Sequence, residues 1–184
     1  MDEIAATSPE EDPVFDKVQK SVTESLLLEL ESKARNAEPS TKLLFKQLKR
    51  KIPRDLDLQT LSIHDEIFAK IDCLECANCC RSLGPRITDN DIQKLSKALK
   101  IKPGQVIDSY LRLDEDGDYV FQQMPCPFLM NDNYCLIYES RPKACREYPH
   151  TNRKRFEQAF SVTIKNVYTC PAVYLIVEKL KTIY

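Results

Sequence analysis

The chain has 184 residues, of which 42% are hydrophobic and 30% are charged, and its formal net charge is −1. These values are typical of one globular domain with extensions, and the balanced charge does not favour a nucleic-acid-binding or membrane-surface protein. The three glycines, Gly84, Gly104 and Gly117, are too far apart to form a glycine-rich phosphate loop. The sequence therefore argues against a nucleotide-binding Rossmann domain.

The N-terminal sequence, MDEIAATSPEEDP, is acidic and lacks the basic start and apolar run of a signal peptide. No apolar stretch approaches the roughly 20 residues that a membrane-spanning helix needs. We therefore expect a cytoplasmic protein whose thiols stay reduced. Eight cysteines in a reducing compartment indicate metal or redox chemistry rather than a disulfide framework.

The first 72 residues contain no cysteine and show helical periodicity. We expect a helix over residues 14–34, because its apolar residues recur on one face. Asp12 and Pro13 would cap and open this helix. The apolar face consists of Val14, Val18, Val22, Leu26 and Leu30.

Two further helices are expected before the first cysteine. One covers TKLLFKQLKRKI, after Pro39 and Ser40, and the next covers LSIHDEIFAKI. We interpret residues 1–60 as a helical N-terminal extension and residues 61–184 as a cysteine-cluster metal-binding domain. The extension would either cover the cysteine domain or pair with a helix of a partner protein. Because it has no cysteine, we expect metal binding to survive its removal.

The remaining elements are short. Thr88 and Asp89 would cap a helix with an apolar face. A short helix over KPGQVIDSYLRL would begin after Pro103 and run to Leu113, and Pro171 would open the last helix. A turn at Asp116-Gly117 precedes a short strand at Tyr119–Gln122, and the β-branched and aromatic residues of 155–168 favour a second strand. The expected fold is mostly α with short strands: a small cysteine-rich metal-binding domain with a helical N-terminal extension.

The stretch CLECANCC places Cys73, Cys76 and Cys79 at C-x2-C-x2-C spacing. Two residues between cysteines form a tight knuckle that can aim both sulfurs at one metal. The same spacing opens the bacterial ferredoxin sequence, whose last cysteine precedes a proline. Here Cys126 and Cys170 each precede a proline, far along the chain. The stretch therefore predicts a metal site.

The adjacent pair Cys79 and Cys80 is poorly suited to one ion, because neighbouring side chains in a helix diverge by about 100°. We expect Cys73, Cys76 and Cys80 to share a helix face and Cys79 to turn toward a second site. The later cysteines are isolated in sequence and would be brought in by the fold. Eight thiols permit two four-ligand sites, or one cluster with four spare thiols.

Other polar residues near the cysteines give weaker indications of a role at a metal site. His150 follows Cys145 by five residues and is more typical of a surface imidazole or a neighbour of the site than of a ligand. Three arginines close in sequence to cysteines would offset the charge of several thiolates, or would be exposed and salt-bridged. They are Arg81, Arg141 and Arg146.

The segments CLECANCC and CPFLMNDNYCLIYESRPKACREYP, followed by a final CP, resemble the YkgJ-type cysteine-cluster family. That family is named for its C-x2-C-x2-C-C motif and is described as a zinc- or iron-chelating domain with eight characteristic cysteines. The resemblance runs from Cys73 to Pro171. Some longer relatives are linked to methylation of lysines in flagellin. The resemblance implies a metal-ligand set of Cys73, Cys76, Cys79, Cys80, Cys126, Cys135, Cys145 and Cys170.

Two interpretations of the metal remain, and a third concerns activity. The ferredoxin-like opening and the all-cysteine ligand set favour an iron–sulfur cluster of the four-iron type. The alternative is a structural zinc module, in which tetrahedral sites replace a larger hydrophobic core. A cluster-dependent protein-modifying enzyme is the third hypothesis, although no nucleophile–base pair is evident. A protein partner is compatible with all three, and we expect no nucleic-acid or membrane partner.

Overall fold

The computed structural model describes the backbone of residues 13–184 and the side chains of residues 25–184. The Asp12 cap and the apolar positions Val14, Val18 and Val22 therefore lie outside the described side chains. Within the described part the protein is mostly helical with one two-stranded antiparallel sheet, which confirms the expected fold class.

The longer helices are α1 (Pro13–Arg50), α2 (Leu56–Phe68), α5 (Asp89–Leu99), α6 (Pro103–Tyr110), α8 (Phe160–Asn166) and α9 (Pro171–Ile183). The short helices are α3 (Cys73–Cys76), α4 (Asn78–Ser82), α7 (Lys143–Glu147), η1 (Tyr138–Ser140) and η2 (Phe156–Ala159). The strands are β1 (Leu111–Leu113) and β2 (Tyr119–Phe121).

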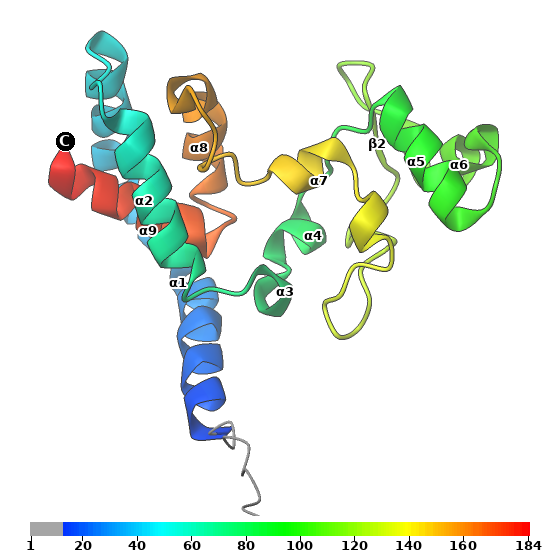
Figure 1. The fold of residues 1–184 in the computed structure, drawn as a ribbon, viewed down its shortest axis with the longest axis horizontal. Coiled ribbons are helices and arrows are strands. Elements are labelled where there is room, and N and C mark those ends of the chain that lie inside the picture. Colours follow the sequence, from blue (N-terminus) through cyan, green and yellow to red (C-terminus); the bar gives the residue numbers. More distant parts are fainter. Residues whose placement is uncertain (1–12) are drawn as a thin grey trace, which may run out of the picture.

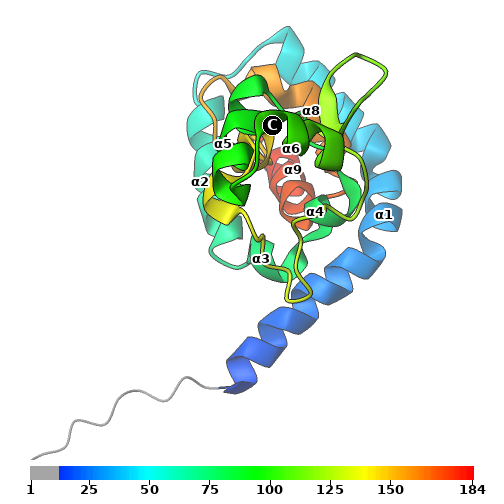
Figure 2. The same cartoon turned by 90° about the vertical axis from the view of Figure 1, so that its right-hand side faces the viewer.

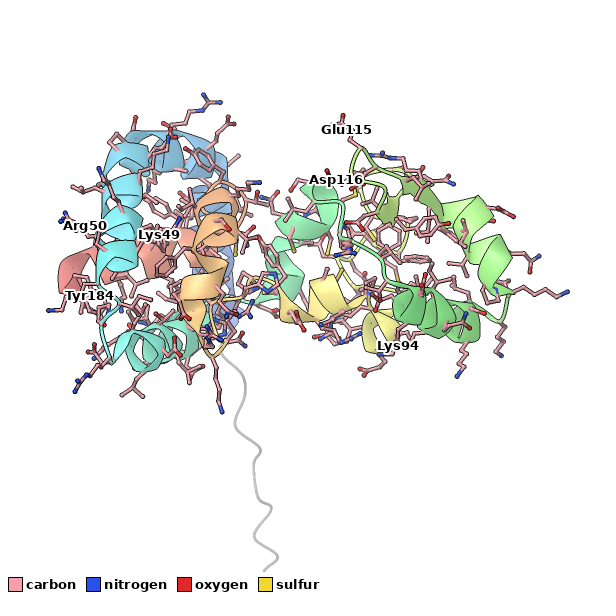
Figure 3. All side chains as sticks on the ribbon, turned by 90° about the horizontal axis from the view of Figure 1, so that it is seen from above. Lys49, Arg50, Lys94, Glu115, Asp116 and Tyr184 are labelled. Atoms are coloured by element: carbon pink, nitrogen blue, oxygen red, sulfur yellow. The ribbon has the colours of Figure 1, made fainter. Side chains whose placement is uncertain are left out.

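The elements form two lobes joined by the cysteine-bearing helices (Figure 1). Helices α1, α2, α8 and α9 make the first lobe, and α5, α6 and the β1–β2 hairpin make the second. Helices α3, α4 and α7 lie between them. Seen from above, Lys49, Arg50 and Tyr184 lie on the first lobe, and Lys94, Glu115 and Asp116 lie on the second (Figure 3). The N-terminal part of α1 extends beyond the other elements (Figure 2).

Helix α9 is the centre of the first core. Its apolar stripe is fully buried and is contacted by α1 and α2. Burial of apolar side chains such as these is the main contribution to the stability of a small helical lobe. Phe45 of α1 packs on Phe160 of α8, with ring centroids 4.9 Å apart. The stripe consists of Val173, Ile176, Val177 and Leu180.

Helix α1 continues through Pro39, so the expected division into two helices at Pro39-Ser40 is wrong. A proline removes one backbone hydrogen bond from a helix, but packing on both sides of it outweighs that loss. Ala34 before Pro39 and Phe45 after it are buried in the same core. The Ala37 carbonyl, near the proline, accepts a hydrogen bond from the Ser40 hydroxyl at 2.9 Å.

The division of the chain near residue 60 stays a prediction. Side chains from both sides of that position share the first core, from Leu44 and Leu56 to Leu180. The N-terminal helices are therefore packed against the C-terminal helix in one hydrophobic cluster.

The second core joins α5, α6 and the hairpin, and it buries Ile92, Leu95, Val106 and Phe121. Helix α5 begins as expected, because the Thr88 hydroxyl caps the Asp91 N–H and the Asp91 carboxylate accepts from the Thr88 N–H. The strand at β2 is confirmed, and it pairs with β1, a segment expected to continue the preceding helix.

The strand expected over residues 155–168 is wrong, because this segment forms η2 and α8. Its buried side chains recur at helical intervals, which outweighs the β propensity of its branched residues. They are Phe156, Ala159, Phe160, Thr163 and Val167.

No single helix of the described residues has the length and apolar character to cross a membrane. The segments Phe156–Asn166 and Pro171–Ile183, which are bent by 120° relative to each other, reach the required length and apolar composition only when they are taken together.

Candidate metal centre

The CLECANCC stretch folds as two short helices rather than one. The Asp72 carboxylate caps α3 by accepting from the Leu74 N–H at 2.8 Å. Ala77 then adopts a left-handed conformation, with φ of 46°, and separates α3 from α4. The expected continuous face of Cys73, Cys76 and Cys80 therefore does not form, since the helix direction changes between Cys76 and Cys80.

Cys170 joins the first three cysteines of the motif. The Asn78 side chain donates to the Thr169 carbonyl at 2.6 Å, which holds α4 against the chain just before Cys170. Burial raises the pKa of the Cys170 thiol to about 12. The N–H groups of Val173 and Ala172 oppose this rise, and the thiols of Cys73 and Cys76 add to it.

Cys79 belongs to the same neighbourhood, because the thiols of Cys170 and Cys73 also raise its pKa, after the effects of Cys80 and of burial. We call Cys73, Cys76, Cys79 and Cys170 the first thiol group.

Cys80 meets the other three cysteines. The Cys126 N–H donates to the Cys80 carbonyl at 2.9 Å, so the two residues are joined through the main chain. Burial first, and then the nearby thiols of Cys80, Cys126 and Cys135, together raise the pKa of Cys145 to about 12. We call Cys80, Cys126, Cys135 and Cys145 the second thiol group. The Cys80 thiol also raises the pKa of Cys73 and Cys76, so Cys80 adjoins the first group as well, and the expected division of Cys79 and Cys80 between two sites stays a prediction.

The two groups adjoin at the Cys79–Cys80 pair. Hydrogen bonding from the Cys79 thiol, with a smaller contribution from Arg81, lowers the pKa of Cys80 to about 7 against the effect of burial. A lowered pKa favours the thiolate, which is the form that binds metal.

Asn133 holds the loop between Cys126 and Cys135 against the motif. It has φ of 68°, and its side-chain amide donates to the Glu75 carbonyl at 3.1 Å. The Arg81 guanidinium donates to the Asn133 side-chain oxygen and, at 3.0 Å, to the Cys76 carbonyl. Arg81 therefore crosslinks backbone that carries both thiol groups.

Asp91 fixes the helix that carries Cys145. Its side chain is 1% exposed, and its carboxylate accepts from the Lys143 N–H at 2.9 Å and the Thr88 hydroxyl at 2.6 Å. Burial alone would raise the pKa of Asp91, but the hydrogen bonds from Thr88 and Lys143 lower it overall. The carboxylate thus stays ionised and anchors α7 to the start of α5.

The expected role of the arginines holds for two of the three. After the opposing effects of burial and of neighbouring thiols, Arg141 lowers the pKa of Cys145, and Arg81 does so for Cys80. Arg146 instead donates to the Arg141 carbonyl. Arg81 also lowers the pKa of Cys76, so these two guanidinium groups favour the thiolate form in both thiol groups.

The histidines have other partners. His64 Nδ1 lies 2.8 Å from the Thr151 hydroxyl, and its ring packs on Phe68. The His150 ring packs edge-on against Tyr148, and burial lowers the pKa of His150. Neither imidazole is placed with the thiol groups.

Sequence reasoning missed Tyr148, which contacts the first group. Its hydroxyl is buried without a hydrogen-bonding partner among the described residues. Burial raises the pKa of this hydroxyl above its usual range, and the thiols of Cys170, Cys79 and Cys76 raise it further. A buried hydroxyl without a partner beside several thiols fits a centre whose sulfurs are metal-bound thiolates, because a thiolate would accept a hydrogen bond from the hydroxyl.

The types of donor atom in the two thiol groups also indicate a metal centre. Each group contains four sulfurs and no oxygen or nitrogen ligand, which suits zinc or iron–sulfur chemistry. Among the described residues, no three cysteine, histidine, aspartate or glutamate side chains already converge closely enough to hold one ion. The thiols of each group are therefore neighbours that must close further to bind a metal.

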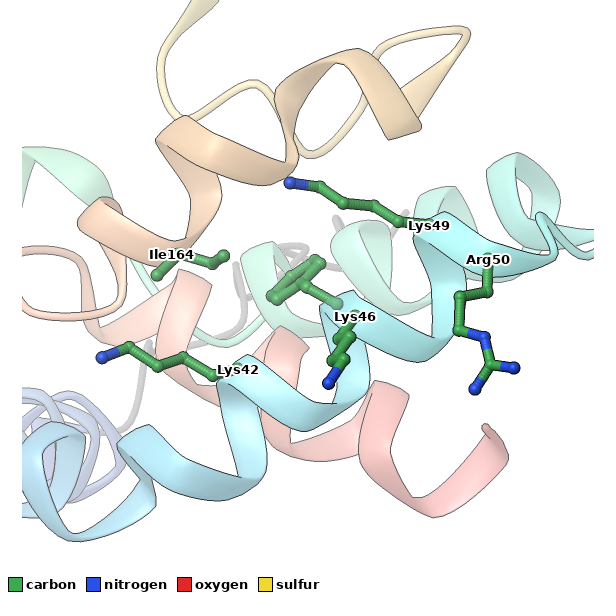
Figure 4. Close-up of a pocket in the computed structure, with 6 residues that line it drawn as sticks. Lys42, Lys46, Lys49, Arg50 and Ile164 are labelled. Atoms are coloured by element: carbon green, nitrogen blue, oxygen red, sulfur yellow. The ribbon is translucent and has the colours of Figure 1, made fainter.

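Two cavities are lined by residues other than the thiols. One, of about 390 Å³, lies between α1 and α8 and is lined by four basic residues together with Phe45 and Ile164 (Figure 4). The other, of about 410 Å³, runs from Ser82 to the β1–β2 hairpin and Met124. Neither of these two cavities is lined by a cysteine.

Comparisons with known proteins agree with this centre. The model of the CxxCxxCC family, described as a "putative zinc- or iron-chelating domain", matches residues 72–166. The match includes seven of the eight cysteines and ends before Cys170. An uncharacterized protein of Methanocaldococcus jannaschii is 29% identical over 109 residues. That alignment covers 58% of this chain and 54% of the relative, so it spans about half of the relative's length. No solved structure matches the chain.

Proposed function

The chain belongs to the CxxCxxCC family, and from this premise we propose that its eight cysteines bind metal in two adjoining four-thiolate sites, the first holding an iron–sulfur cluster. One observation supports the proposal: Cys79 lies beside Cys170 and Cys73, whereas Cys145 lies beside Cys80, Cys126 and Cys135.

The first thiol group supports an iron–sulfur cluster by its sequence pattern. It combines a C-x2-C-x2-C stretch with a distant cysteine that precedes a proline, Cys170-Pro171. The same elements occur in bacterial ferredoxin sequences, where all ligands to a four-iron cluster are cysteines. The long separation between Cys79 and Cys170 is bridged by the Asn78–Thr169 hydrogen bond.

The second thiol group draws its ligands from four separate segments. Four thiolates would carry a net negative charge on binding a divalent ion, and the guanidinium groups of Arg81 and Arg141 offset it. Such a set suits a tetrahedral zinc ion as well as an iron–sulfur cluster. Zinc in both groups is therefore the second candidate function, favoured by the C-x2-C knuckle at Cys73 and Cys76.

Either metal requires reduced thiols. All eight cysteines are free in the structure, and a cytoplasmic location would keep them so. Metal binding would also draw the thiols of each group together and thereby stabilise the junction between the lobes.

The test is purification without oxygen, followed by measurement of iron, zinc and acid-labile sulfide per chain and of the visible spectrum. We expect a brown protein with about four iron and four sulfide in the first site. A colourless protein with zinc alone would overturn the iron–sulfur assignment and leave the two-site arrangement. A protein that binds neither metal would overturn the proposal as a whole.

A further inference from the structure

We propose that Tyr148 donates a hydrogen bond to the metal-bound sulfur of Cys170 and is a positioning residue that tunes the first site. The inference rests on the proposed function, because it requires metal at the first thiol group. It adds a role for a side chain that does not itself bind the metal.

The position of Tyr148 is fixed from two directions. It follows α7, the helix that carries Cys145, and the Tyr148 N–H donates to the Ala144 carbonyl at 3.1 Å. On its other side, the buried side chain of Asn166 donates to the Pro149 carbonyl at 3.4 Å. The carbonyl of the same Asn166 accepts from the Cys170 N–H at 2.8 Å. Asn166 thus holds the backbone of Tyr148 and that of Cys170 in one arrangement.

The hydroxyl of Tyr148 has no partner with hydrogen-bond geometry among the described residues, although it is buried beside the Cys170 thiol. A buried hydroxyl without a partner is costly, and native proteins rarely leave one so. A neutral thiol is a weak acceptor, whereas a metal-bound thiolate is negatively charged and accepts more strongly. Metal binding would therefore supply the partner that the hydroxyl lacks.

The expected effect follows from charge. A hydrogen bond to a cluster sulfur stabilises the more negative, reduced form and raises the reduction potential. It also orients the ligand and strengthens metal binding, as neighbours of metal ligands commonly do. The hydroxyl acts here as a donor and keeps its proton in its buried setting.

The test compares the full-length protein with Tyr148→Phe, which removes one oxygen and keeps the ring. The matched control is Tyr134→Phe, because Tyr134 is 54% exposed. All three proteins are purified without oxygen, and metal content, midpoint potential and the rate of metal loss to a chelator are measured. For Tyr148→Phe we expect unchanged metal content, a more negative potential and metal loss faster by about tenfold, with no change in the control.

A site that takes zinc is tested by the same variants loaded with Co²⁺. The thiolate-to-cobalt charge-transfer band should then shift in Tyr148→Phe and not in Tyr134→Phe. If wild type and Tyr148→Phe bind metal with the same spectrum, potential and loss rate, this inference is wrong while the proposed function stands. If the wild-type protein binds no metal, the proposed function itself fails, and this inference fails with it.

Discussion

The side-chain amide of Asn78 donates to the main-chain carbonyl of Thr169 at 2.6 Å, across 91 positions of the chain. Asn78 begins α4, the helix that carries Cys79 and Cys80, and Thr169 precedes Cys170. This one hydrogen bond connects the cysteine motif to the remote cysteine of the first thiol group.

Replacing Asn78 with alanine should weaken the first site more than the second. Without the amide, Cys170 is no longer held beside Cys73, Cys76 and Cys79, and we expect affinity for first-site metal to fall about tenfold. Chelator titration of the metal-loaded protein measures this. Asn90→Ala is the control, because Asn90 is exposed on α5. Equal weakening of both sites in Asn78→Ala would contradict the assignment of this contact to one group.

Serine in place of Cys79 or Cys80 should remove different metal complements. A hydroxyl is a harder ligand than a thiolate and stays protonated near neutral pH, so a substituted site loses most of its affinity. We expect Cys79→Ser to lose metal from the first thiol group and Cys80→Ser from the second. Iron, zinc and sulfide per chain, measured on identically prepared proteins, separate the two cases. Complete loss in both variants would instead indicate one cooperative centre.

Asp91→Asn should destabilise the protein by about 2 kcal/mol near neutral pH, because the three charge-assisted hydrogen bonds that the carboxylate accepts from Thr88 and Lys143 are weakened. The folded-state pKa of Asp91 lies below its usual value. The contribution of this carboxylate is therefore fully present above its unfolded-state pKa, near 4, and is lost as the pH falls through the folded-state value.

The measurement for Asp91 is the difference in unfolding free energy between wild type and Asp91→Asn at several pH values. Acid protonates the thiols of both proteins alike, so only the difference reports on Asp91. We expect the difference to shrink steadily below about pH 4. A difference that does not change with pH would show that the asparagine acts through packing rather than through charge.

Phe45→Ala should destabilise the whole protein, although Phe45 lies in the cysteine-free N-terminal region. Its side chain is 1% exposed and packs on Phe160, and truncation of a buried phenylalanine costs about 3–5 kcal/mol. Leu43→Ala is the control on the same helix, since Leu43 is 55% exposed and should change stability by less than about 0.5 kcal/mol. Thermal and denaturant unfolding measure both.

The Phe45 result also bears on the expectation that metal binding survives removal of the N-terminal extension. Deleting α1 would expose the face of α9 that it covers, so the remaining chain would lose part of its core as well as a helix. Similar stability of Phe45→Ala and Leu43→Ala would support the extension as a dispensable cover.

Much of the local structure was determined by the sequence alone. Thr88 with Asp89 and the Cys170-Pro171 step mark helix starts because their effects act within one turn of the chain. The crowded cysteines likewise indicate a metal-binding family, since sulfur ligands and C-x2-C spacing are properties of the sequence.

The tertiary structure decided what depends on distant neighbours. Helix α1 runs through Pro39 because Ala34 and Phe45 pack in one core, and residues 156–166 are helical because their buried side chains repeat at helical intervals. The left-handed turn at Ala77 divides the cysteine motif into α3 and α4, and no propensity of alanine predicts it. Ligand types are set by residue identity, but the proposed sorting of eight thiols into two groups requires contacts between segments far apart in the chain.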